Sequence, residues 1–158
     1  MEGGLNMTRI ISRKPMPGDI VVADRIIYKH YGIYAGEGRV IHFAAQRGKE
    51  KDPKHAKIIE SSLASFLKDS PVLVEESDDQ PAFPSDQVVE NARARLGEKG
   101  YSILTNNCEH FANECKYGVK KSRQVDAFLK MAGMAVLVIG VPLVGEKTVW
   151  QEFCRART

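Results

Sequence analysis

The amino-acid sequence predicts an α+β protein in which an antiparallel sheet packs against helices. β-rich apolar runs gather in the first half of the chain, and two of them flank a short glycine-containing loop, which is typical of a β-hairpin. Two segments in the second half have the capping residues and apolar spacing of amphipathic helices. With 158 residues, 43% of them hydrophobic, the chain is long enough for one ordinary globular domain.

The predicted hairpin comprises the runs 25–35 and 39–45, and it follows a shorter β-rich run at 20–23. We expect residues 36–38 to form an odd-length loop, which sets His42 opposite Gly32. His30 is then the diagonal neighbour of His42 on the same face, with about 7 Å between the backbones, within reach of the two imidazoles. An even-length loop would place the two histidines on opposite faces.

The chain between the hairpin and the first long helix predicts only short elements. Residues 46–55 are polar and charged and indicate a surface loop that includes His55. Short strands are expected at 56–60 and 71–75, with a short helix beginning at Ser61 or Ser62 between them. The acidic run 75–79 is expected to be a solvated linker without an ion site.

The first predicted helix covers residues 85–96, with Ser85 as its N-cap and Gly97 as its stop. Its buried stripe is expected to consist of Val88, Val89, Ala92 and Leu96. This helix is interpreted as scaffold.

The second predicted helix begins with Asn106 or Asn107 as N-cap, places Cys108 in its first turn and ends at Gly118. The helix dipole and the first-turn N–H groups are expected to lower the pKa of that thiol and to stabilise an oxyanion. His110 points away from Cys108 by about 160° around the helix. A base for the thiol must therefore come from elsewhere, and the hairpin histidines are the obvious source.

Composition narrows the function. A net charge of +3 is too small to indicate a nucleic-acid partner. The three cysteines match no disulfide or zinc spacing, which predicts a reduced, intracellular protein without a metal or other cofactor. A zinc site at Cys108, His30 and His42 would lack a fourth ligand. Residues 1–14 contain no apolar signal-peptide run and are expected to form a flexible lead.

The C-terminal part contains an apolar run at 131–144 without a charged residue. It is shorter than the about 20 residues of a spanning helix. Its glycines and Pro142 favour a membrane segment, and a buried core helix or hairpin is the alternative. Basic residues before the run favour a cytosolic catalytic domain.

Three separated motifs carry a family resemblance. They are Tyr28-Lys29-His30-Tyr31-Gly32-Ile33-Tyr34, then Val40-Ile41-His42-Phe43, then Asn106-Asn107-Cys108-Glu109-His110-Phe111. In this order they resemble the lecithin:retinol acyltransferase family, which includes the small phospholipase A/acyltransferase proteins related to the H-Ras-like suppressors. The resemblance covers about residues 15–125. It implies a permuted NlpC/papain-like thiol hydrolase fold, with the nucleophile at a helix N-terminus and the histidine strands before the cysteine helix.

The resemblance also implies roles. Cys108 matches the nucleophile, His30 the base that deprotonates it, His42 the residue that orients His30, and Tyr28 a tyrosine that supports the oxyanion. It implies glycerophospholipid substrates, whose acyl chain passes through a thioester to water or to a lipid amine or hydroxyl. The residue directly after His30 is Tyr31, and retinol acyltransferase also has Tyr at this position, whereas members of the phospholipase group typically have Trp.

The resulting division of the chain is a lead at 1–14, a catalytic domain at 15–125 and a membrane-anchoring segment at 126–158, with the enzyme on the cytoplasmic face of a membrane. Two other functions remain. One is a papain-like peptidase or isopeptidase, which the hydrophobic tail and the Asn-Cys-Glu-His-Phe context disfavour. The other is a non-catalytic, membrane-associated interaction protein of the same fold, which the intact set of Cys108, His30 and His42 disfavours.

Overall fold

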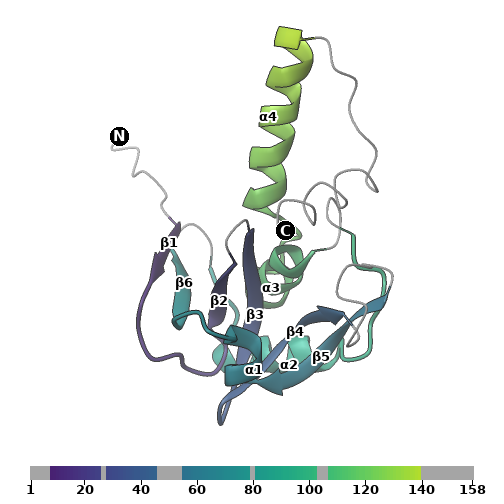
Figure 1. Cartoon of the computed structure of the whole chain (residues 1–158). Coiled ribbons are helices and arrows are strands. Elements are labelled where there is room, and N and C mark those ends of the chain that lie inside the picture. The colour runs from purple at the N-terminus through teal and green to yellow at the C-terminus, as the bar shows by residue number, and fades with distance from the viewer. Residues whose placement is uncertain (1–7, 26–27, 46–54, 79–80, 103–106, 140–158) are drawn as a thin grey trace.

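The structure, a computed structural model, describes residues 8–25, 28–45, 55–78, 81–102 and 107–139. These residues form a six-stranded antiparallel sheet with helices on both of its faces (Figure 1). The predicted α+β class and antiparallel sheet are therefore confirmed.

The sheet has the strand order β1-β6-β2-β3-β4-β5. Its strands are β1 (Thr8–Ile11), β2 (Ile20–Arg25), β3 (Tyr28–Gly36), β4 (Arg39–Ala45), β5 (Ala56–Ser62) and β6 (Leu73–Ser77). β1 falls within the lead expected at 1–14, so that part of the lead belongs to the sheet, where it pairs with β6. A strand of four residues is too short for its alternation to identify it from sequence.

The β3–β4 hairpin has the predicted register but not the predicted loop. Gly36 pairs with Arg39, which leaves a two-residue turn of Glu37 and Gly38, both at positive φ (49° and 69°). The pairing shifts between Tyr34 and Gly36, because a bulge adds one residue to β3. Ile33 therefore faces Ile41, and Tyr34 faces Val40, as an odd-length loop would have placed them.

The two faces of the sheet bury separate cores. One face packs on α2 (Ser85–Arg93) and α3 (Cys108–Tyr117), and its core includes Tyr31, Ile33, Phe43, Cys108 and Phe111. The other face is covered by α1 (Leu63–Leu67), and its core includes Val21, Ala23, Val40 and Phe66. Successive residues of β3 alternate between the two cores, as the period of two requires.

The first predicted helix differs at both ends. Pro84 occupies the N-cap position of α2 without a side-chain cap, so Ser85 is the first helical residue and not the cap. The helix ends at Arg93, and turns continue to Gly97 at φ +84°. Because those turns leave the helical spiral, Leu96 is 44% exposed, while Val88, Val89 and Ala92 are buried as predicted.

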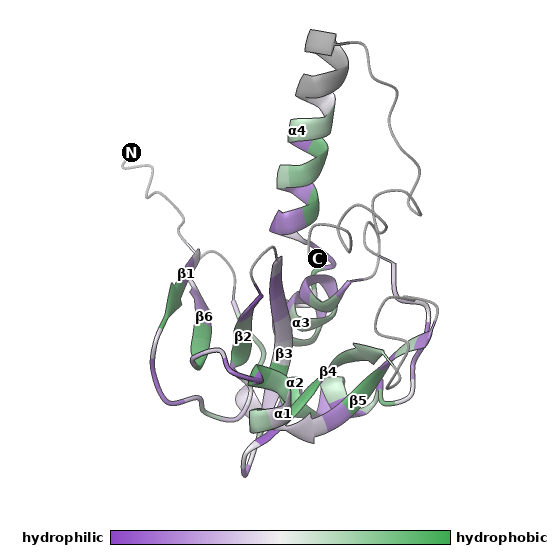
Figure 2. Ribbon diagram, in the orientation of Figure 1, coloured by the Kyte–Doolittle hydropathy of each residue, from purple (hydrophilic) through white to green (hydrophobic). Residues whose placement is uncertain are grey.

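The last described element is α4 (Arg123–Ile139), which projects away from the sheet (Figure 1) and carries both polar and apolar residues in its first turns (Figure 2). It contains the first nine residues of the predicted apolar run, and residues 140–144 of that run lie outside the described residues. Among the helices that the structure describes, none has both the length and the hydropathy needed to cross a bilayer. Phe128, Leu129 and Met131 are 39%, 46% and 70% exposed.

Candidate active site

Cys108 is the first residue of α3, as predicted, and Asn107 is the N-cap. The Asn107 side-chain oxygen accepts the main-chain N–H groups of Glu109 (3.0 Å) and His110 (2.9 Å). The Asn107 N–H in turn donates to Nδ1 of His110 at 3.2 Å, which completes a capping box. His110 therefore caps the helix that carries Cys108, which agrees with its predicted unsuitability as the base. The helix ends at Gly118, in the left-handed conformation.

The sulfur of Cys108 lies at the edge of β3, along the part of that strand that β4 does not pair with. Tyr34 directs its N–H and carbonyl toward the β2 side, to Asp19 and Gly18, at 2.9 Å each. By alternation, Lys29 and Tyr31 direct theirs toward the β4 side. The β3–β4 pairing extends no further toward Lys29 than Ile33, and β4 turns away from β3 together with β5 (Figure 1). The main-chain groups of Lys29 and Tyr31 therefore need other partners.

Cys108 supplies one of these partners. Its Sγ lies 3.9 Å from the Lys29 carbonyl oxygen, to which the thiol donates. The Tyr31 N–H is directed to the same sulfur. Because Lys29 and Tyr31 flank His30, the sulfur lies beside the stretch of main chain that bears the His30 side chain.

The two hairpin histidines meet, as the predicted register requires. His30 Nε2 lies 2.9 Å from His42 Nδ1. Both rings contact Phe66 of α1, with 5.0 Å between ring centroids in each case. The histidine rings therefore lie on the α1 face, whereas Cys108 reaches the edge of β3 from the α3 face. Among the contacts of the described residues, none joins the His30 ring to the sulfur, so the alignment of the two stays a prediction.

A third residue extends the histidine pair. His42 Nε2 lies 2.8 Å from Oγ of Ser61 on β5, and that hydroxyl donates to the Ser62 carbonyl at 3.4 Å. If the hydroxyl proton is used in this way, Oγ accepts from His42 Nε2–H. His42 Nδ1 is then the acceptor for His30 Nε2–H, which leaves His30 Nδ1 with a free lone pair. The Phe43 carbonyl, 3.0 Å from His42 Nδ1, favours the opposite tautomer.

Burial keeps all three side chains uncharged near neutral pH. It lowers the pKa of His30 well below its usual value and that of His42 to about 4, and nearby Arg25 acts in the same direction on both. It also raises the pKa of the Cys108 thiol to about 12, although the N–H groups of Tyr31, Glu109 and Cys108 itself act against this. The expectation of a lowered thiol pKa is therefore wrong for this structure, because desolvation outweighs the helix N-terminus.

The remaining predicted residues have simpler positions. The ring of Tyr28 lies 6.4 Å from that of His30, edge-on, on the same strand. Cys115 is 2% exposed in the α2/α3 core, where a small apolar side chain fits. Within the described part of the chain, no group of three or more Cys, His, Asp or Glu side chains is arranged to hold a metal ion.

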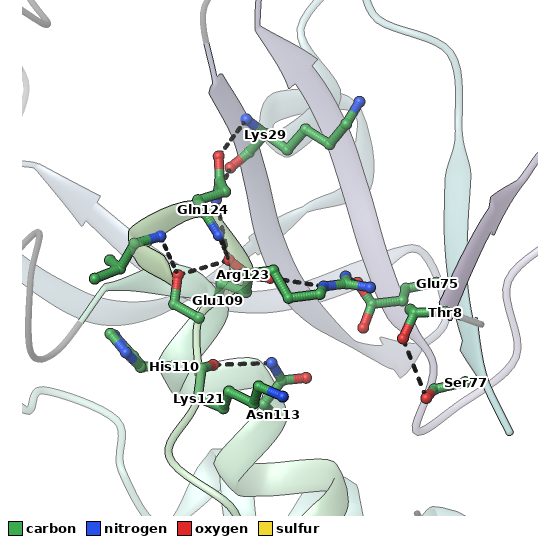
Figure 3. A network of polar contacts seen from close by, with 12 residues as sticks. Thr8, Lys29, Glu75, Ser77, Glu109, His110, Asn113, Lys121, Arg123 and Gln124 are labelled. Carbon is green, nitrogen blue, oxygen red and sulfur yellow. Dashed lines mark hydrogen bonds and ion pairs between the residues drawn. The ribbon is translucent and has the colours of Figure 1, made fainter. Parts of the chain in front are cut away.

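A buried ionic network beneath the site was not predicted from the sequence (Figure 3). Glu109 is fully buried, and its carboxylate accepts from Ser122 Oγ (2.7 Å), from Arg123 Nε (3.3 Å) and from the main-chain N–H of Gln124 (3.1 Å). Arg123 also pairs with Glu75, which is 2% exposed. Glu75 is thus not part of a solvated linker.

These elements define an α+β protein with a buried cysteine at a helix N-terminus, against the main chain of the strand that carries His30, and with a pair of contacting histidines on the other face of the sheet. The family model described as "Lecithin retinol acyltransferase" matches residues 13–121. The chain belongs to this family.

Three relatives are similar over most of the chain. Human "Phospholipase A and acyltransferase 2" is 32% identical over 145 residues, with 84% of this chain and 90% of the relative covered. Mouse "Phospholipase A and acyltransferase 3" is 30% identical over 151 residues, with the same coverage. Mouse "Lecithin retinol acyltransferase" is 31% identical over 134 residues, which cover 70% of this chain and 58% of the relative.

Proposed function

We propose that the protein is a thiol-dependent phospholipase A and acyltransferase that takes an acyl chain from a glycerophospholipid onto Cys108. Membership of the family, and the names of its phospholipase and acyltransferase relatives, support the reaction class. The observation that carries the assignment to residues is the 2.9 Å contact between His30 and His42, beside the main chain that holds the Cys108 sulfur.

In the proposed first step, the Cys108 proton passes to Nδ1 of His30, because Nε2 of that ring is occupied by His42. The sulfur forms a bond to the ester carbonyl carbon, and the N–H groups directed at Cys108 stabilise the oxyanion, with Tyr28 as a further candidate donor. The ester C–O bond then breaks, and His30 returns the proton to the departing lysophospholipid oxygen.

In the second step, water or a lipid amine or hydroxyl attacks the thioester and loses its proton to His30. The Cys108 thiolate leaves and is reprotonated. Water as acceptor gives a phospholipase A outcome, and a lipid acceptor gives N- or O-acyl transfer. His42 orients His30 throughout and spreads the positive charge that His30 acquires.

The same proposal includes the chain's architecture and location. The histidine strands precede the cysteine helix, as in a permuted NlpC/papain-like fold, and residues 15–125 form the catalytic domain. The exposed Phe128, Leu129 and Met131 of α4 would rest in lipid, with residues 126–158 as the anchor on the cytoplasmic face of a membrane.

The test is an assay in mixed micelles with phosphatidylcholine and phosphatidylethanolamine, each labelled in its acyl chains, using wild type and Cys108→Ala. Free fatty acid with lysophospholipid identifies hydrolysis, and N-acylated phosphatidylethanolamine identifies transfer. Cys115→Ala is the matched control, because it removes a thiol of the same helix outside the site. Product from Cys108→Ala at the wild-type rate would refute the proposal. Absence of product from wild type, with retinol also supplied as acceptor, would favour the interaction protein.

A further inference from the structure

Gln124, in the first turn of α4, bonds to the edge of β3 where β4 is absent. Its Oε1 accepts the Lys29 N–H at 3.0 Å, and its Nε2 donates to the Lys29 carbonyl at 3.2 Å. The side-chain amide thus pairs with both main-chain groups of one residue, as a neighbouring strand would. That carbonyl is the one that also accepts the Cys108 thiol.

The amide of Gln124 is held from its other side as well. Its Nε2 lies 3.4 Å from Oε2 of the buried Glu109, and its main-chain N–H donates to the same oxygen at 3.1 Å (Figure 3). The nitrogen therefore faces two acceptors and the oxygen faces a donor, which determines the orientation of the amide. A carboxylate at this position would face the Lys29 carbonyl and Glu109 without a proton to donate.

We propose that Gln124 is a positioning residue for Cys108. The Gln124 amide fixes the Lys29 carbonyl at the edge of β3. It also offsets the partial negative charge of that carbonyl and the charge of Glu109 beside the sulfur. This inference rests on the proposed role of Cys108 as nucleophile. It also means that the base of α4, the helix with exposed apolar residues, is bonded to the main chain that the sulfur contacts.

The direction of the effect follows from the groups around the sulfur. In addition to burial, which raises the pKa of both groups, Glu109 of α3 raises the pKa of the Cys108 thiol, and Cys108 in turn raises the pKa of the Tyr31 hydroxyl on β3. Arg123 of α4 pairs with Glu109 at 3.3 Å, the His30 ring of β3 stacks on Phe66 of α1, and the Lys29 amine pairs with Asp24 at 3.2 Å. Loss of the Gln124 amide leaves the Lys29 carbonyl and Glu109 with one donor fewer each. Both become more repulsive to a thiolate, so Cys108 should ionise at higher pH.

The experiment measures the rate at which iodoacetamide labels Cys108 between pH 6 and pH 10, with mass spectrometry of the Cys108 peptide to separate it from the other cysteines. For Gln124→Ala we expect labelling at pH 8 to be about fivefold slower than in wild type, the effect of one lost hydrogen bond. Gln124→Glu should be slower still, because it adds a negative charge. Gln87→Ala is the matched control, since Gln87 is an exposed helical glutamine that bonds Asn91, and it should label like wild type.

If Gln124 had only a structural role, its loss would change the labelling rate in the opposite direction. Loosening of the fold would expose a buried thiol, so Gln124→Ala would label faster than wild type, and that result would overturn the proposal, as would an unchanged pH profile. The labelling rates do not depend on lipid turnover. Failure of the micelle assay in wild type would refute the proposed function and leave this test intact, whereas full turnover with unshifted labelling would refute only the role of Gln124.

Discussion

Mild acid should destabilise the folded protein through His42. His42 is 6% exposed, and burial lowers its pKa from 6.5 to about 4. As the pH falls through 6.5, the unfolded chain binds a proton at His42 that the folded protein does not bind until about pH 4. The free energy of unfolding therefore decreases across this window.

At pH 5 the contribution of His42 amounts to about 2 kcal/mol relative to pH 7, because one unit of pKa difference corresponds to about 1.4 kcal/mol. Other groups also titrate in this range. The pKa of His30 is lowered and acts in the same direction, whereas the raised pKa of Glu75 acts against it. A comparison of wild type with His42→Asn cancels much of these shared contributions.

The assay is urea unfolding followed by circular dichroism at pH 7 and pH 5. Wild type should lose about 2 kcal/mol more than His42→Asn between the two pH values. The matched control is His55→Asn, since His55 is exposed, and it should keep the acid dependence of wild type. Equal losses in wild type and His42→Asn would refute the claim that His42 is buried in its neutral form.

Three further predictions concern other parts of the structure. Arg123→Leu should lower the free energy of unfolding by about 2 kcal/mol at pH 8, because it leaves the buried Glu75 and Glu109 without their shared cation. Arg123 is 39% exposed, which keeps the loss below that of a fully buried pair. An equal loss at pH 5, where Glu75 can protonate, would contradict this reasoning. Ser61→Ala should reduce the rate of lipid turnover several-fold, because His42 Nε2–H loses its acceptor and the tautomer of His42 is no longer fixed. The thiol should still react with iodoacetamide. A turnover rate equal to that of wild type would exclude the proton chain through Ser61. Gly118→Ala should cost about 1 kcal/mol in thermal unfolding, because Gly118 has φ +71° and a new Cβ would lie 3.3 Å from Phe83; Gly38→Ala, also at positive φ but with nothing within 4 Å, separates backbone strain from the contact.

The parts of the fold that could be predicted from the sequence are those determined by local patterns. The hairpin itself followed from two β-rich runs around a glycine-containing loop, and the shared face of His30 and His42 followed from assuming an odd-length loop at residues 36–38. The cap at Asn107 and the stop at Gly118 followed from the preferences of those residues at helix ends. The bulge in β3 was not predictable, because no residue type marks it, and it happened to restore the register that a three-residue loop would have produced.

The parts that could not be predicted depend on contacts far apart in the chain. Glu75 stands in an acidic run that is typical of a solvated linker, and its burial depends on Arg123, which comes from another element. Gln124 carries no local signal, since its role arises from the divergence of β4 from β3. The raised pKa of Cys108 has the same origin, because the elements packed around the thiol remove it from water and this desolvation outweighs the helix N-terminus.

These features together indicate that the site rests in an uncharged state. A thiol with its pKa raised to about 12 and histidines with lowered pKa values form a neutral set at pH 7, not a thiolate–imidazolium pair. Neutral partners avoid the cost of burying two ions before a substrate is present. Charge would then develop only as the proton leaves Cys108 during attack on the ester. The ester carbonyl oxygen becomes an oxyanion at that point, and the N–H groups of Tyr31 and Cys108 would stabilise this oxygen as well as the sulfur. On this reasoning, turnover between pH 6 and pH 8 should depend only weakly on pH, and a steep change of the turnover rate within that range would contradict the neutral resting state.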